Sequence, residues 1–279
     1  MNRVLDRREL APAVTLLELE APLIQRRWKA GQFIILRPRE ESERIPLTIM
    51  DSSEARKSIS IVVQVVGRTS AETAGLQVGE QVAGLVGPLG EPAEICEGKR
   101  VLCIAGGVGV AELLPVVRAY VAAGNEVSVF CGARSDEFRI LDAELTEAAG
   151  KVHWATDDGS FGFHGNVVEL LKRTAGPGQF DEGHIIGPIP MMQAGSEATR
   201  DWGMKLHASL NPVMIDGTGM CGGCRVTVDG NVKFACVDGP AFDAHAVDFE
   251  ELARRNRAYK TQERLAMEHH GCRVGLDVR

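Results

Sequence analysis

The chain has 279 residues, 44% of them hydrophobic and 25% charged, so it is long enough for two or three globular domains. Its net charge of −7 argues against nucleic-acid binding, which usually requires a basic surface. No apolar run reaches the roughly eighteen residues of a membrane span, and the charged start MNRVLDRREL lacks the apolar core of a signal peptide. We therefore expect a cytoplasmic protein with reduced thiols and no membrane span.

Residues 1–95 are expected to form a domain that is all β. Short apolar or alternating runs are separated by turn residues, and strands at such regular spacing are typical of a small antiparallel barrel. The expected strands are residues 14–19, 33–36, 45–49, 58–66 and 81–86.

Residues 96–208 alternate between strand and helix patterns. This alternation predicts a parallel sheet with helices on both faces, the architecture of many nucleotide-binding domains. The expected strands are 100–104, 126–131, 151–155 and 184–186, and the expected helices are 111–122, 141–148 and 167–172.

A glycine loop, Gly106-Gly107-Val108-Gly109, lies between the first of these strands and the first helix. Glycine lacks a Cβ atom, so the backbone can turn sharply and approach a pyrophosphate at the N-terminus of the helix. The loop is shorter than the full G-x-G-x-x-G motif, and a simple tight turn is the alternative interpretation.

Two later turns follow predicted strands and belong to the same edge of the sheet. One contains Asp157 and Asp158, and the other contains Gly187, Pro188 and Met191. Because ligands of parallel sheets bind at the carboxyl ends of the strands, these turns and the glycine loop predict one shared nucleotide site.

Arg134 follows the strand 126–131, at the position where a 2′-phosphate of NADP(H) would lie. Asp136 is close by in sequence and would repel that phosphate. We expect NAD(H) as the nucleotide, and the sequence leaves NADP(H) open.

Residues 209–246 are rich in glycine and contain Cys221, Cys224 and Cys236 at C-x2-C-x11-C spacing. Thiolates suit iron–sulfur clusters, and glycine-rich loops let backbone amides reach the sulfur atoms. Asp216 lies four intervening residues before the first of these cysteines.

A structural zinc site is the competing interpretation of the same segment, but a second C-x2-C or a histidine pair is missing. Spacing alone also leaves Asp229, Asp238 and Cys272 open as fourth ligands. The remaining residues, 247–279, form a charged tail with helical composition, either a solvated helix or a docking arm for a partner.

The β-rich half resembles the ferredoxin–NADP reductase superfamily through Arg44-Ile45-Pro46-Leu47-Thr48-Ile49, the GPLG at 87–90 and the GGVG at 106–109. The resemblance implies that the barrel binds FAD and that Thr48 lies near the flavin N5 atom. Arg44 stands four positions before Thr48, whereas the arginine of the superfamily motif usually stands three positions before the serine or threonine. The other positions that the resemblance assigns to the flavin are Pro46, Leu47, Gln64, Val65, Thr69, Ser70 and Gly87.

The C-terminal pattern D-x4-C-x2-C-x11-C resembles the small subunit of NADH-dependent ferredoxin:NADP+ oxidoreductase, also known as sulfide dehydrogenase. It is also similar to the electron-transfer subunit of dihydroorotate dehydrogenase, in which a cysteine replaces the aspartate. The resemblance implies a [2Fe–2S] cluster with Asp216, Cys221, Cys224 and Cys236 as its ligands.

The resemblance further implies an electron path from NADH through FAD and the cluster to a larger subunit that contains FAD and [4Fe–4S] clusters. That heterodimeric partner would carry out flavin-based electron bifurcation with NADPH and ferredoxin. Dihydroorotate dehydrogenase or a hydrogenase is the alternative partner, and a module with structural zinc is the alternative of a different class. Because the cofactors perform the redox chemistry, no residue is expected to act as a catalytic acid or base.

Overall fold

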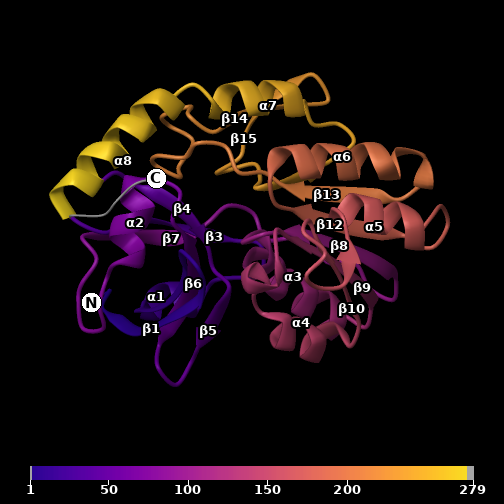
Figure 1. Ribbon diagram of the computed structural model, residues 1–279, viewed down its shortest axis with the longest axis horizontal. Coiled ribbons are helices and arrows are strands. Elements are labelled where there is room, and N and C mark those ends of the chain that lie inside the picture. The colour runs from indigo at the N-terminus through magenta and orange to yellow at the C-terminus, as the bar shows by residue number, and fades with distance from the viewer. Residues whose placement is uncertain (1, 275–279) are drawn as a thin grey trace.

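The computed structural model describes residues 2–274 and the side chains of residues 2–268. Figure 1 shows an indigo-to-purple β domain beside a magenta-to-orange α/β domain, and the yellow C-terminal helices pass over both. Among the described residues, none of the helices is long and apolar enough to cross a membrane.

The N-terminal half is an antiparallel barrel of two sheets, as expected from the strand spacing. One sheet has the order β1-β2-β6-β5 and the other the order β4-β3-β7. Two short helices, α1 (Pro22–Gln25) and α2 (Arg68–Ala74), pack against β6. The strands are β1 (Val4–Ala11), β2 (Val14–Glu20), β3 (Phe33–Arg37), β4 (Ile45–Thr48), β5 (Asp51–Ser53), β6 (Ser58–Gln64) and β7 (Gly84–Leu89).

Several details of the barrel differ from the sequence prediction, which also lacked β5. The last strand begins at Gly84, because Gln81 makes only an isolated bridge to Arg3. β1 was missed because it is an edge strand, and several of its charged residues, such as Arg8 and Glu9, are exposed.

The second half contains a seven-stranded sheet of order β11-β10-β9-β8-β12-β13-β16, parallel except at the pair β13–β16. Apolar residues of α3 and α4 pack on one face, and those of α5 and α6 pack on the other. The strands are β8 (Arg100–Gly106), β9 (Glu126–Ala133), β10 (Val152–Thr156), β11 (Phe163–His164), β12 (Glu182–Ile186), β13 (Lys205–Ser209) and β16 (Ala241–Asp243). The helices are α3 (Gly109–Ala122), α4 (Asp142–Ala149), α5 (Val167–Thr174) and α6 (Ile189–Thr199), with short 3₁₀ turns η1 (Asp136–Phe138) and η2 (Arg200–Trp202).

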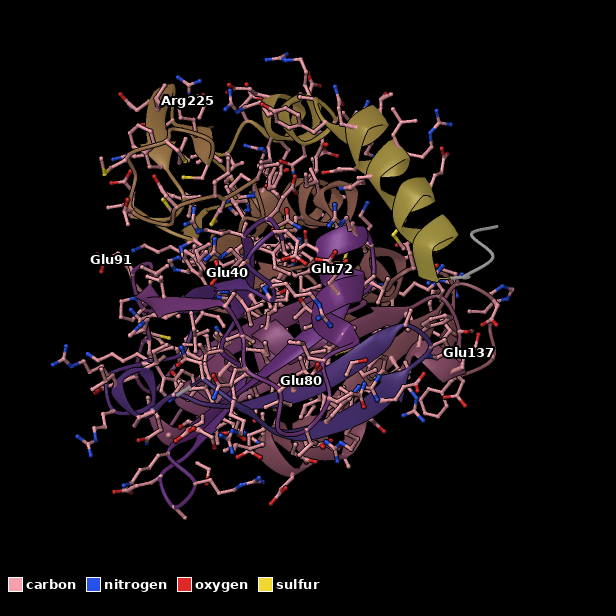
Figure 2. All side chains as sticks on the ribbon, turned by 90° about the vertical axis from the view of Figure 1, so that its left-hand side faces the viewer. Glu40, Glu72, Glu80, Glu91, Glu137 and Arg225 are labelled. Carbon is pink, nitrogen blue, oxygen red and sulfur yellow. The ribbon has the colours of Figure 1, made fainter. Side chains whose placement is uncertain are left out.

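The cysteine-rich segment leaves this sheet after β13 and returns to it through β16. Between them lies a small hairpin, β14 (Arg225–Val228) and β15 (Asn231–Phe234). Two helices follow, α7 (Phe249–Asn256) and α8 (Lys260–Val274), so the helical composition of the tail was interpreted correctly. α8 contacts α2 on the outside of the barrel, and Figure 2 shows it there beside the helix that carries Glu72.

The domains share their apolar cores. Phe33 and Ile35 of β3 belong to the same buried cluster as Met214 and Cys224 of the cysteine-rich segment. On the other face of the sheet, Val14 of β2 packs in one cluster with residues of α3 and β8. Burial of these shared apolar surfaces fixes the barrel against the carboxyl edge of the parallel sheet.

Candidate cofactor sites

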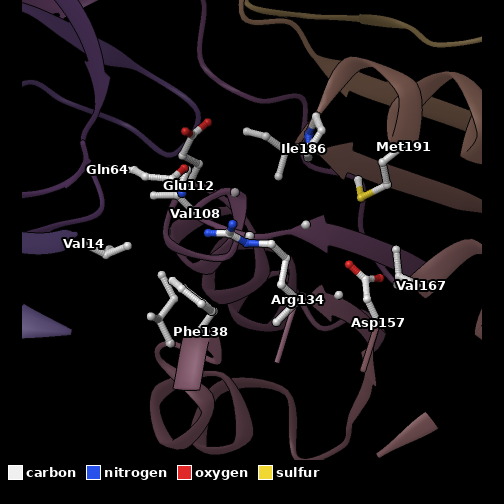
Figure 3. Close-up of a pocket in the computed structure, with 18 of the residues that line it drawn as sticks. Val14, Gln64, Val108, Glu112, Arg134, Phe138, Asp157, Val167, Ile186 and Met191 are labelled. Atoms are coloured by element: carbon white, nitrogen blue, oxygen red, sulfur yellow. The ribbon is translucent and has the colours of Figure 1, made fainter. Parts of the chain in front are cut away.

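A cavity of about 640 Å³ lies where the carboxyl ends of β8, β9, β10 and β12 face the barrel. Gln64 and Val65 line it from the barrel, and the glycine loop lines it from the sheet (Figure 3). This is the edge at which parallel sheets usually bind their ligands.

The glycine loop forms the floor of this cavity, and glycine is favoured by backbone conformation at one position and by close packing at the other two. Gly107 has φ +57° and open space around it, so the backbone conformation selects glycine there. A Cβ atom on Gly106 would collide with Met191, and one on Gly109 would come within 2.8 Å of the Ile186 carbonyl oxygen. Gly109, the first residue of α3, lines the cavity, so the N-terminus of this helix borders it.

Most of the other residues predicted at the sheet edge also line the cavity: Arg134, Asp157, Gly187, Pro188 and Met191. The Arg134 guanidinium lies 4.4 Å from the centre of the Phe138 ring, which lines the same cavity. Asp158 does not line it. Its carboxylate instead accepts hydrogen bonds from the backbone and the hydroxyl of Ser160, and these bonds hold its pKa below the usual range.

A smaller cavity of about 90 Å³ adjoins the first on the barrel side. Pro46, Leu47 and Thr48, the residues that the resemblance assigns to the flavin, all line it. Glu112 lines both cavities, so the two are neighbours at that residue.

Four predicted flavin positions lie outside both cavities. Arg44 is exposed just before β4. Thr69 and Ser70 lie in the first turn of α2, where the Ser70 hydroxyl accepts hydrogen bonds from the Val66 and Gly67 amides and starts the helix. Gly87 is explained by packing within the sheet, since a Cβ there would come within 2.7 Å of Ile34.

Sequence reasoning missed Glu112, the ionisable residue in the first turn of α3. Burial raises its pKa to about 7, and a hydrogen bond with the Thr48 side chain opposes part of that shift. Its position directly after the glycine loop is the signal that could have identified it. The other missed lining residues of the large cavity are Val14, Val66, Gly132, Ala133, Phe138, Ile140, Asn166, Val167, Ile186 and Asn211.

The three cysteines of the C-x2-C-x11-C pattern lie in neighbouring loops. The buried sulfur atoms of Cys224 and Cys236 are 3.1 Å apart, and Cys221 is exposed. Burial raises the pKa of the Cys236 thiol to about 12, and the hydrogen bond with Cys224 adds to the shift. Binding of a metal cation would favour the thiolate form of Cys236.

Asp216 is anchored beside these cysteines. Its carboxylate accepts hydrogen bonds from the backbone amides of Thr218 and Cys221, at 2.9 and 2.8 Å, and these bonds keep its pKa below the usual range. The loop therefore presents an ionised carboxylate next to the first cysteine. Gly217 and Gly219 adopt positive φ in this loop, which glycine allows.

The other candidate ligands are placed differently. The Asp238 carboxylate accepts a hydrogen bond from the Phe234 amide, and Asp229 lies in the turn of the β14–β15 hairpin. The Cys272 side chain lies outside the described residues. Among the described side chains, no three histidine, cysteine or acidic groups converge on one metal-ion position. Two separate pairs of donors suit a two-iron cluster, in which each iron takes two protein ligands.

The cysteine-rich segment matches a known protein family. Residues 211–248 match the family model of the iron–sulfur cluster binding domain of dihydroorotate dehydrogenase B. This range contains Asp216, Cys221, Cys224 and Cys236, together with β16.

Relatives match almost the whole chain. A homolog of the dihydroorotate dehydrogenase B (NAD(+)) electron transfer subunit from Thermotoga maritima is 39% identical, with 96% of this chain and 95% of the relative covered. The electron transfer subunit of that enzyme from Desulforamulus reducens is 31% identical, with 90% of this chain and all of the relative covered.

A solved structure of NADH-dependent reduced ferredoxin-NADP oxidoreductase, which was studied for flavin-based electron bifurcation, is also similar. It matches with a TM-score of 0.90 and 38% identity, over 97% of this chain and 98% of that one. The ferredoxin-reductase-like fold and the iron–sulfur segment support binding of FAD, NAD(H) and a [2Fe–2S] cluster. The chain belongs to the family of the dihydroorotate dehydrogenase B electron-transfer subunits, which are NAD(P)H-dependent flavin and iron–sulfur oxidoreductase subunits.

Proposed function

We propose that the chain is the small subunit of an electron-bifurcating NADH-dependent ferredoxin:NADP+ oxidoreductase. Its partner would be a larger subunit with FAD and [4Fe–4S] clusters, which performs the bifurcation and reacts with NADPH and ferredoxin. The observation that carries this proposal is the near full-length similarity, at a TM-score of 0.90, to the solved oxidoreductase. Reduced thiolate ligands favour a reducing compartment, and we place the complex in the cytoplasm.

In this proposal the large cavity holds NADH and the barrel holds FAD. The glycine loop Gly106–Gly109 binds the pyrophosphate, and the residues that position the rest of the nucleotide are Arg134, Asp157, Gly187, Pro188 and Met191. Bound FAD accepts a hydride and releases electrons singly. Pro46, Leu47 and Thr48 line the adjoining cavity and, with Gln64 and Val65, hold the flavin ring. The Ser70 side chain stabilises the first turn of α2, which also contains Thr69.

Asp216, Cys221, Cys224 and Cys236 are the proposed ligands of the cluster. Cys224 and Cys236, whose sulfur atoms are already close, would share one iron. Asp216 and Cys221 would share the other, because the Asp216 carboxylate accepts a hydrogen bond from the Cys221 amide. The closeness of the two members of each pair supports this division, which gives each iron two ligands.

Replacement of Asp216 tests the carboxylate ligand. Asp216→Cys should keep a [2Fe–2S] cluster but change its reduction potential and EPR g-values, because a thiolate donates more electron density than a carboxylate. Asp216→Ala should make the cluster labile. Asp238→Ala is the matched control, since Asp238 is also an acidic residue that accepts a backbone hydrogen bond near the cysteines. Unchanged spectra and potential in both Asp216 variants would place the fourth ligand elsewhere.

The second candidate function is electron transfer in dihydroorotate dehydrogenase B. The match of residues 211–248 to that enzyme's iron–sulfur domain favours it. Asp216 argues against it, because the dihydroorotate enzymes resembled by this segment have a cysteine at that position.

Purification of the native complex under anoxic conditions separates the two candidates. The bifurcating complex should reduce NADP+ only when NADH and reduced ferredoxin are both present, and it should contain more flavin and iron than this chain alone binds. Formation of orotate from dihydroorotate with NAD+, without any NADP+ reduction, would contradict our proposal and support the second candidate.

A further inference from the structure

Glu112 occupies the point at which the two cavities meet. Of the residues that line both, Ile186 and Asn211 cannot ionise at neutral pH, and Glu112 can. Figure 3 shows the Glu112 side chain beside Gln64, on the barrel side, and across the cavity from Asp157 and Met191. The carboxylate therefore lies between the proposed nucleotide and flavin sites.

The surroundings of Glu112 contain few charges. Arg134 and Asp157 line the large cavity, and on the same helix Arg118 is paired with Asp51 of β5 at 2.8 Å. Behind the small cavity, the His184 ring bonds the Ser209 hydroxyl at 2.8 Å, and burial lowers the His184 pKa to about 3, so that ring is neutral. None of these groups governs the pKa of Glu112, which burial raises to about 7. Glu112 can therefore accept or release a proton near neutral pH.

Electron transfer through this chain requires a proton to move. A hydride carries two electrons and one proton, but an iron–sulfur cluster accepts only electrons, one at a time. For each hydride delivered by NADH, one proton must therefore leave the flavin site when the two electrons depart. Thr48 and Glu112 line the small cavity together, the Thr48 side chain lowers the pKa of Glu112, and Glu112 also borders the large cavity.

We propose that Glu112 accepts this proton through the Thr48 hydroxyl and releases it to solvent through the large cavity. Thr48 Oγ1 takes up one proton while its own hydroxyl proton passes to a carboxylate oxygen of Glu112, so Thr48 ends unchanged. Glu112 then returns the proton to water. In the reverse direction the same groups supply the proton. This inference rests on the proposed function, because it places the flavin beside Thr48.

Glu112→Gln is the direct test, because glutamine keeps the size and can accept the Thr48 hydrogen bond but does not ionise. In the FAD-loaded chain, reduction of the flavin by NADH should stay within about threefold of wild type, since the hydride brings its own proton. Flavin oxidation through the cluster should slow about tenfold or more at pH 7 and lose its pH dependence near that value. Thr48→Val should behave like Glu112→Gln, and Thr48→Ser should retain the wild-type profile.

Infrared difference spectroscopy gives a readout that does not depend on turnover. Oxidation of the wild-type flavin should change the band of a protonated carboxyl group, and Glu112→Gln should lose that change. Glu147→Gln, on the exposed face of the neighbouring helix α4, is the matched control and should keep it. A carboxyl band that persists in Glu112→Gln, or an unaltered pH profile of flavin oxidation, would overturn the inference.

Thermal unfolding of the same FAD-loaded proteins tests the ionisation itself. The folded protein binds the Glu112 proton more tightly than the unfolded chain does, so wild type loses stability as pH rises from about 4.5 to about 7. Glu112→Gln lacks this titration, and its melting temperature relative to wild type should rise across that window. If the difference in melting temperature between Glu112→Gln and wild type stayed constant across that pH window, the pKa of Glu112 would not be raised. Absence of bound FAD, or of flavin reduction by NADH, would instead contradict the proposed function.

Discussion

Cys224→Ser should abolish the [2Fe–2S] cluster and leave the flavin in place. Wild type should contain about two irons and two acid-labile sulfides per chain, and the variant should contain almost none. The expected effect is large because the Cys224 sulfur is buried, 3.1 Å from the sulfur of Cys236. A serine hydroxyl is a harder ligand than a thiolate, and no thiol from solvent can take its place at this buried position. Iron and sulfide analysis, with visible and EPR spectra, measures the outcome.

A second cysteine provides the control for this experiment. Cys96 is a partly buried free thiol in the segment before β8, and its pKa is raised mainly by burial, as expected of a structural thiol. Cys96→Ser should keep the full iron and sulfide content. Stoichiometric zinc without sulfide in wild type would contradict the cluster assignment and restore the structural-zinc alternative.

The sequence predicted the layers of the fold well because hydrophobic periodicity is a local signal. β8 is an almost continuous apolar run, and the alternation of strands with helical segments after it predicted the parallel sheet. β16 was not predicted because it has only three residues, Ala241–Asp243, and its strand conformation depends on pairing with β13. Such short strands are determined by tertiary contacts rather than by their own composition.

The candidate site was predicted in part, for a similar reason. The residues at the sheet edge could be grouped because parallel strands end at a common edge, and all of them except Asp158 line the large cavity. The approach of Thr48 to Glu112 could not be predicted, because it joins the barrel to a helix of the other domain. Only the packing of shared cores brings these two residues together.

Gly107→Glu should prevent reduction of the flavin by NADH while FAD and the cluster remain bound. Gly107 lies in the floor of the large cavity with no atoms near the place of a Cβ, so the glutamate side chain would extend into the proposed pyrophosphate site. Steric exclusion and charge repulsion act in the same direction there. Because hydride transfer requires close alignment of the two rings, the rate should fall about a hundredfold or more. Stopped-flow bleaching of the flavin band with NADH measures it.

The change also places a non-glycine residue at φ +57°, which costs about 1 kcal/mol in the folded chain. Gly124→Glu controls for this strain, since Gly124 has φ +76°, is equally open and lies beyond the C-terminus of α3, away from the cavity. It should reduce its flavin at the wild-type rate. In Gly107→Glu, dithionite should still reduce the cluster, because the proposed ligands lie in another segment. Bleaching of Gly107→Glu at the wild-type rate would mean that this loop does not hold the nucleotide, and the assignment of residues 96–208 as its binding domain would have to be abandoned.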